Sequence, residues 1–161
     1  MGESGDDTYN IESLYAKTVI YDSDNVGVVN IGTNKSSLKV FYDMKVTISG
    51  GVITACDYNS LRLYTTDGGL LNGISIMANP NPAGATDGTP AQSITSVSDN
   101  NSHTLEDIDG LAYATANWIA ANKADGVYST AELVQGADST AILGIATGDT
   151  IVNNVKTNYW S

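Results

Sequence analysis

Between residues 38 and 63 the chain carries the pattern that most constrains its fold. Apolar residues occupy every second position from Leu38 to Ile48, as in a β-strand with one buried face. Gly50-Gly51 follows, and consecutive glycines accept the positive φ angles of a tight hairpin turn. We therefore predict two antiparallel strands folded back at this turn. Further strands must cover them, because an isolated hairpin is marginally stable in water.

The register of this hairpin follows if apolar side chains face apolar ones and polar face polar. With a two-residue loop at Gly50-Gly51, each residue of the first strand has a defined partner on the second. The predicted pairs are Ile48 with Ile53, Val46 with Ala55, and Thr47 with Thr54.

Short strands are also predicted on both sides of the hairpin, separated by turn residues. The segments are 17–21, 26–31, 61–65 and 70–77, the last two forming a hairpin around Asp67-Gly68-Gly69. Residues 11–77 therefore predict an antiparallel β-sheet region of sandwich or barrel-like type. Residues 1–10 are acidic and polar, and we expect them to form a flexible arm.

The second half of the chain has a different composition. Residues 78–103 hold all three prolines among Gly, Asn and Ser, so we expect a loop or an arm. An amphipathic helix is predicted over 104–122, with Thr104 as its cap. Ser129 to Glu132 has the pattern of a capping box that opens one helical turn. A final strand pair is predicted at 140–146 and 150–156. The predicted fold class is therefore mainly β with one helix, an α+β protein. We expect residues 104–161 to pack on the same domain as the sheet region.

The charge balance excludes several partners. Eighteen Asp and Glu against seven Lys and Arg give a net charge of −11. Nucleic acids and anionic membranes are bound through Lys and Arg, so we expect neither as a partner. Every apolar run is much shorter than a membrane span, and no signal peptide is visible in this chain. Cys56 is the only cysteine, which excludes an internal disulfide and indicates a packed thiol.

Catalytic chemistry is restricted by the residues available. His103 is the only histidine, no nucleophile-elbow pattern is present, and the start of a helix explains Ser102, His103 and Asp107 without catalysis. One histidine and one cysteine disfavour a zinc site, and no glycine motif for phosphate occurs. The spacing of the acidic residues identifies no glycosidase pair. We therefore predict no catalytic residue, no cofactor and a non-enzymatic protein.

A calcium site is a weaker alternative. Asp22-Ser-Asp24-Asn25 begins like an oxygen-rich calcium loop, which makes Asp22 and Asp24 the candidate metal ligands. The twelfth position of such a loop carries Glu, whereas this chain has Thr33 there. Acidic turns are common in β-proteins, so the same residues also fit an ordinary turn.

Two short segments resemble FMN-binding domains that attach flavin phosphate to a threonine. Residues 109–115 are similar to the Asp-x-x-Ser-Gly-Ala-Thr stretch of that family, with Ala112 in place of the serine and Tyr113 in place of the glycine. Residues 46–54 are similar to one of its strand–turn–strand segments. The resemblance implies a flavin attached to Thr115.

The functional expectation rests on a mismatch between the surface and the export signals. The chain is poor in Lys and Arg and rich in Asn, Thr, Ser, Gly and Tyr, as exported proteins are, yet it has neither leader nor disulfide. A virion protein, such as a capsid decoration, fibre or tail subunit, fits both facts because it is released by lysis. It would form homo-oligomers or contact other capsid subunits. The expected interface residues are Pro80, Pro82, Pro90, Tyr159 and Trp160. The alternatives are a secreted filament or binding module whose leader was removed, and the flavin domain.

Overall fold

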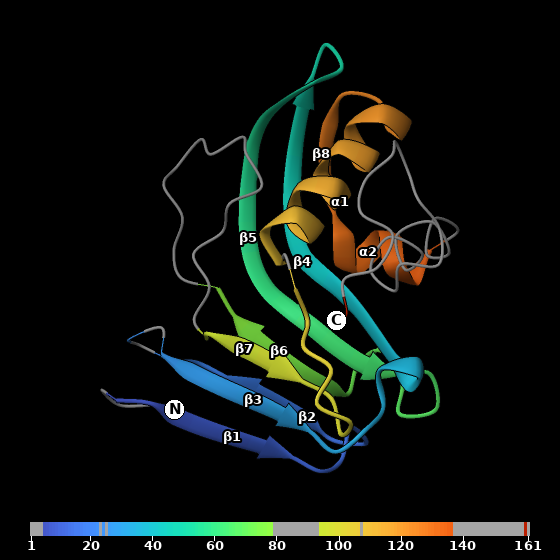
Figure 1. The fold of residues 1–161 in the computed structure, drawn as a ribbon. Coiled ribbons are helices and arrows are strands. Elements are labelled where there is room, and N and C mark those ends of the chain that lie inside the picture. The colour runs from blue at the N-terminus through green and yellow to red at the C-terminus, as the bar shows by residue number, and fades with distance from the viewer. Residues whose placement is uncertain are drawn as a thin grey trace.

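The structure, a computed structural model, describes residues 5–22, 24, 26–78, 94–106, 108–136 and 160. The described part is mainly β, with two α-helices (Figure 1). The strands are β1 (Asp7–Ile11), β2 (Lys17–Ile20), β3 (Gly27–Ile31), β4 (Leu38–Ser49), β5 (Val52–Thr65), β6 (Gly73–Met77), β7 (Ser96–Ser98) and β8 (Gly126–Ser129). The helices are α1 (Ile108–Asn122) and α2 (Thr130–Gln135), and a short 3-10 helix spans Lys35–Ser37.

The predicted central hairpin is confirmed as β4 and β5, with φ angles of 60° at Gly50 and 76° at Gly51. Ile48 lies opposite Ile53 as predicted, but the register shifts between Thr47 and Ile48. The other predicted pairs are wrong: Val46 lies opposite Cys56, and Thr47 lies opposite Ala55. The physical reason is a β-bulge, which inserts Thr54 as one extra residue in β5.

A five-stranded sheet is built on this hairpin, in the order β2-β6-β5-β4-β8. The predicted hairpin around residues 67–69 is confirmed, because β5 and β6 pair antiparallel. Residues 61–65 are the second half of the long strand β5 and not a separate strand. Strand β8 was not predicted; it pairs with β4 and forms the other edge of the sheet.

A second sheet contains β1, β3 and β7, all parallel. Strand β2 is also parallel to its neighbour β6. The chain crosses between the two sheets several times, and β3, β6 and β7 each pair in parallel with a strand that the chain formed before it crossed to the other sheet (Figure 1). The described strands therefore form two open sheets and no closed barrel, and the predicted antiparallel order of residues 11–77 is wrong at these pairings. Residues 7–10 belong to β1, not to a flexible arm.

The larger part of the core lies on one face of the central hairpin, and the second half of β5 is buried on both faces. The alternate residues of β4 are almost fully buried: Leu38, Val40, Tyr42, Met44, Val46 and Ile48. In Figure 1 helix α1 lies against the upper half of β4 and β5, and it buries Leu111 and Ile119 completely. Burial of these alternating apolar side chains is the main driving force for the fold.

Helix α1 begins at Ile108, four residues later than predicted. Thr104 and Leu105 are extended instead and form isolated bridges with Ser98 and Trp160, so Thr104 does not cap the helix. The predicted turn after Ser129 is confirmed as α2, although the Ser129 side chain makes no capping hydrogen bond.

Several predicted segments lie partly or wholly outside the described residues. Strand β7 lies inside 78–103, the segment predicted as a loop. Residues 79–93, the expected strand pair at 140–146 and 150–156, and Tyr159 lie outside the described residues. No helix in the described ranges is long and apolar enough to cross a membrane.

Candidate functional site

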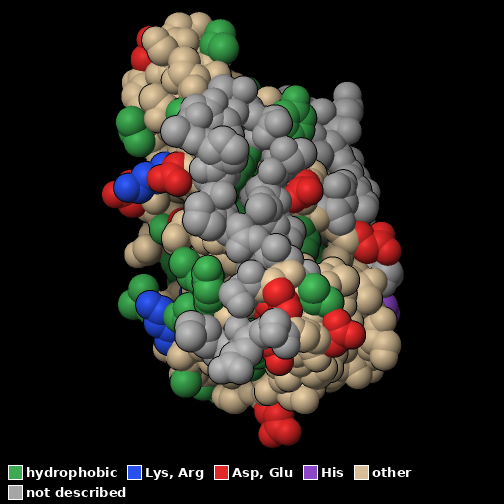
Figure 2. Space-filling model, turned by 90° about the vertical axis from the view of Figure 1, so that its left-hand side faces the viewer, with side chains coloured by type: hydrophobic (Ala, Val, Ile, Leu, Met, Phe, Trp, Pro, Cys, Tyr) green, Lys and Arg blue, Asp and Glu red, His purple; other side chains and the backbone are tan. Residues whose placement is uncertain are grey.

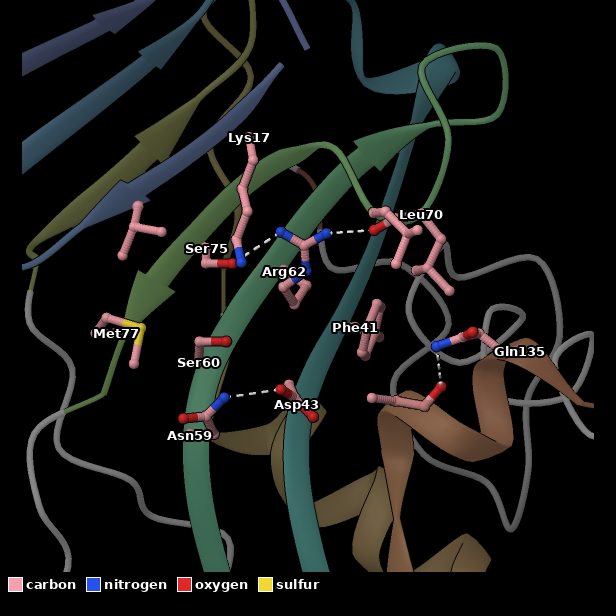
Figure 3. A pocket seen from close by; sticks show the side chains of 13 residues that line it. Lys17, Phe41, Asp43, Asn59, Ser60, Arg62, Leu70, Ser75, Met77 and Gln135 are labelled. Atoms are coloured by element: carbon pink, nitrogen blue, oxygen red, sulfur yellow. Dashed lines mark hydrogen bonds between the residues drawn. The ribbon is translucent and has the colours of Figure 1, made fainter. Parts of the chain in front are cut away.

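The face of the five-stranded sheet opposite the core carries a groove. Its larger part, of about 490 Å³, lies over a row of paired residues, Phe41 with Arg62 and Arg62 with Ser75. A second part, of about 340 Å³, shares Asp43, Asn59 and Ala131 with the first. The polar residues of the larger part are Lys17, Asp43, Asn59, Ser60, Arg62, Ser75 and Gln135. We call the two parts together the back groove; Figure 3 shows the larger one.

Arg62, the only arginine of the chain, stands in the middle of this groove and is 8% exposed. One amino group donates hydrogen bonds to the Ile74 carbonyl (3.0 Å) and the Ser75 hydroxyl (2.8 Å). The other donates to the carbonyls of Leu70 (2.5 Å) and Asn72 (2.8 Å). These bonds fasten the turn between β5 and β6 to the sheet, and all four acceptors are neutral.

The charge of Arg62 has no carboxylate in contact with it among the described residues. Burial lowers the pKa of Arg62, while Asp43 and Tyr64 act in the opposite direction. An arginine side chain nevertheless stays protonated in proteins. A positive charge is therefore held close to the groove and is only partly offset by Asp43.

Asp43 and Asn59 form the other polar pair of the groove. The Asn59 amide donates to Asp43 Oδ2 at 2.8 Å, and the Thr130 hydroxyl lies 3.3 Å from Asp43 Oδ1. Figure 3 shows the pair side by side, apart from Arg62. The groove thus offers a polar Asn–Asp pair at one end and the cation of Arg62 in its middle.

Basic side chains are concentrated on this face of the sheet. Lys39 and Lys45 alternate with the core residues of β4, on the same side as Asp43, and Lys17 lines the larger part of the groove. Lys45 faces Asp57 across the strands. In Figure 2 the Lys and Arg side chains in view lie along one side of the molecule, and most of the acidic ones lie elsewhere. The lining of the back groove carries three cations, Lys17, Lys45 and Arg62, and two carboxylates, Asp43 and Asp57.

No protein-family model, curated protein or solved structure matches the chain. The function is therefore inferred from the geometry of this molecule alone, beginning with the residues singled out by the sequence.

The predicted metal ligands, Asp22 and Asp24, lie in a turn after β2. Asp22 is fully buried; its carboxylate accepts hydrogen bonds from the Tyr9 hydroxyl (3.1 Å) and the Asp24 backbone N–H (3.2 Å). Burial and the bond to Asp22 raise the pKa of Tyr9 to about 12. Among the described residues no group of three or more His, Cys, Asp or Glu is placed to hold a metal. The two carboxylates serve here as turn-forming acceptors.

Thr115, the predicted flavin residue, faces the core. Its side chain is 1% exposed, and its hydroxyl donates to the Leu111 carbonyl at 2.8 Å. Tyr113 is 51% exposed on the other side of α1. Attachment of a flavin phosphate to Thr115 would require α1 to move away from the sheet.

His103 pairs with Asp99, a contact that the sequence did not indicate. The imidazole Nδ1 lies 3.0 Å from Asp99 Oδ2. Asp99 also accepts backbone N–H bonds from Lys35 (2.9 Å), His103 (2.8 Å) and Asn101 (3.0 Å). Burial raises the pKa of Asp99, but these hydrogen bonds outweigh it and bring the pKa down to about 2. Asp99 thus joins two loops of the fold.

Of the predicted interface residues, only Trp160 is described. It is 5% exposed, belongs to the hydrophobic core and forms a backbone bridge with Leu105. Its ring therefore packs on its own chain. Pro80, Pro82, Pro90 and Tyr159 lie outside the described residues.

Proposed function

We propose that this protein is a non-enzymatic structural protein that assembles with copies of itself or with other subunits, as a capsid decoration, fibre or tail protein does. The supporting observation is a pair of open sheet edges. β1 is the outer strand of one sheet and β2 the outer strand of the other. Both lie in the lower part of the molecule in Figure 1.

These edges have the properties of a surface for strand pairing. Neither β1 nor β2 has a second strand partner among the described residues. Three large apolar side chains in or beside β2 are exposed: Tyr15 by 64%, Val19 by 54% and Tyr21 by 41%. An open edge presents backbone N–H and C=O groups in a row, so another strand can extend the sheet.

A virion or extracellular location is proposed from the composition. A surface poor in Lys and Arg and rich in Asn, Thr, Ser and Gly resembles that of exported proteins, and the single cysteine fits synthesis in a reducing compartment. A secreted binding module is the second candidate, favoured by the back groove.

Light scattering and negative-stain microscopy over a range of protein concentrations test the proposal. We expect concentration-dependent oligomers in the wild type and their loss in Val19→Lys, because a charge on an edge strand opposes pairing. Val52→Lys is the matched control: Val52 is 64% exposed beside the β4–β5 turn. A wild type that stays monomeric at every concentration, and binds no capsid, would contradict the proposal. So would equal effects of the two lysines.

A further inference from the structure

We propose that the back groove binds a small organic carboxylate with several hydroxyl groups, a sugar acid of the uronic type. The inference goes beyond assembly and does not depend on it. It rests on the juxtaposition, in one groove, of a buried arginine that contacts no carboxylate of the described residues, an exposed lysine, and an Asn–Asp pair.

The first step is the buried charge. Charged side chains are seldom nine-tenths buried unless an opposite charge accompanies them. Arg62 is 8% exposed, yet its four hydrogen bonds all go to neutral acceptors. Three of the seven Lys and Arg residues line the groove, in a protein whose net charge is −11. A bound carboxylate would supply the missing counter-charge.

The second step is the group that would touch this carboxylate. The four amino hydrogens of Arg62 are already used, so Arg62 contributes mainly its electrostatic field. Lys17 lines the same part of the groove, and its ammonium is not bonded to a described residue. An ammonium can donate three charge-assisted hydrogen bonds, so Lys17 is the expected direct contact.

The third step is the rest of the ligand. A volume of about 490 Å³ lies in the range typical of small-molecule sites. Asn59, Ser60 and Gln135 offer donors and acceptors suited to hydroxyl groups, and Leu70 and Phe41 offer an apolar wall for a ring. Asp43 accepts from hydroxyls but repels a second negative charge. The groove therefore suits one carboxylate on a polyol and opposes a compact polyanion.

Isothermal titration calorimetry with glucuronate, and with glucose and sulfate as comparators, tests this site. We expect saturable binding of glucuronate only, and about tenfold weaker binding in Lys17→Gln, the loss expected for one charge-assisted hydrogen bond. Lys39→Gln is the matched control, because it removes the same charge from the same sheet face outside the groove lining. We expect it to change the affinity less than about twofold, as for a screened surface charge.

Three results would overturn the inference: no saturable binding of glucuronate, equal binding of glucose, or equal weakening by the two lysine substitutions. Light scattering on the same samples reports assembly separately. Loss of glucuronate binding with intact oligomers refutes the groove and leaves the assembly proposal standing. Binding of glucuronate to a strictly monomeric protein supports the groove and contradicts the assembly proposal.

Discussion

The hydroxyl of Thr130 holds α2 to the middle of β4, and removing it should destabilise the fold measurably. Thr130 is fully buried; its Oγ1 accepts the Met44 backbone N–H at 2.7 Å and lies within donating distance of the Tyr42 and Met44 carbonyls, at 3.0 and 3.1 Å. In Thr130→Val a group of nearly the same shape can neither accept nor donate. The buried Met44 N–H loses its side-chain acceptor.

An unsatisfied buried donor costs about 1–3 kcal/mol, and the lost donated bond adds about 0.5–1.5 kcal/mol. We therefore expect Thr130→Val to lower the free energy of unfolding by about 2–4 kcal/mol. For a chain of this length that corresponds to a fall in Tm of roughly 10 °C.

Urea and thermal denaturation followed by circular dichroism measure the effect. Thr130→Ser keeps the hydroxyl and should keep most of the stability. Thr54→Val is the surface control: the Thr54 hydroxyl donates to the Thr47 carbonyl at an exposed site, and its loss should cost less than about 0.5 kcal/mol. A Thr130→Val protein as stable as the Thr54→Val protein would refute the assigned hydrogen bonds.

Two further predictions test the loops and turns. The pKa of Asp99 is about 2 in the folded state, below its ordinary value of 3.8, so its charged form stabilises the fold above about pH 4 and this contribution is lost as the pH falls towards 2. Urea midpoints measured across this range should fall in the wild type and change less in Asp99→Asn; parallel curves would contradict this. Gly73→Ala should abolish soluble folded protein, because φ at Gly73 is 85° and an added Cβ would meet the Leu63 carbonyl oxygen. Gly69 is the control: its φ is 87°, but an added Cβ would lie in open space. Gly69→Ala should therefore lower the free energy of unfolding by only about 1–2 kcal/mol. Soluble yield and Tm measure both, and equal losses would contradict the close contact at Gly73.

The central hairpin was predictable because its information is local. Alternation from Leu38 to Ile48 and the two glycines after Ser49 define both the strand and the turn. The bulge at Thr54 was not predictable, since alternation continues on either side of it. The same holds for the parallel pairing of β1 with β3, because a parallel partner is chosen by the path of the chain and not by the strand's own pattern.

The candidate site was less accessible to sequence reasoning. The polar positions of β4, such as Asp43, are visible in the alternation. The environment of Arg62 is not, because its acceptors are backbone carbonyls of a turn. The helix start was placed too early at Thr104, because a good capping residue precedes a helical pattern there; Leu105 instead bridges to Trp160, a contact between distant parts of the sequence.

The alternation of the chain between two sheets also bears on how the molecule is made. Lys17 pairs with Gly73, so β2 has no neighbour until the whole β4–β5 hairpin and its following turn have left the ribosome. Val29 of β3 pairs with Val97 of β7, which is synthesised later still. The pairing of β1 with β3 joins strands that are closer in the sequence. Closing such long loops slows folding, so refolding should begin at the hairpin and recruit the N-terminal strands last. Until β6 is synthesised, β2 is an unpaired strand in the nascent chain, and we expect a chaperone to bind it.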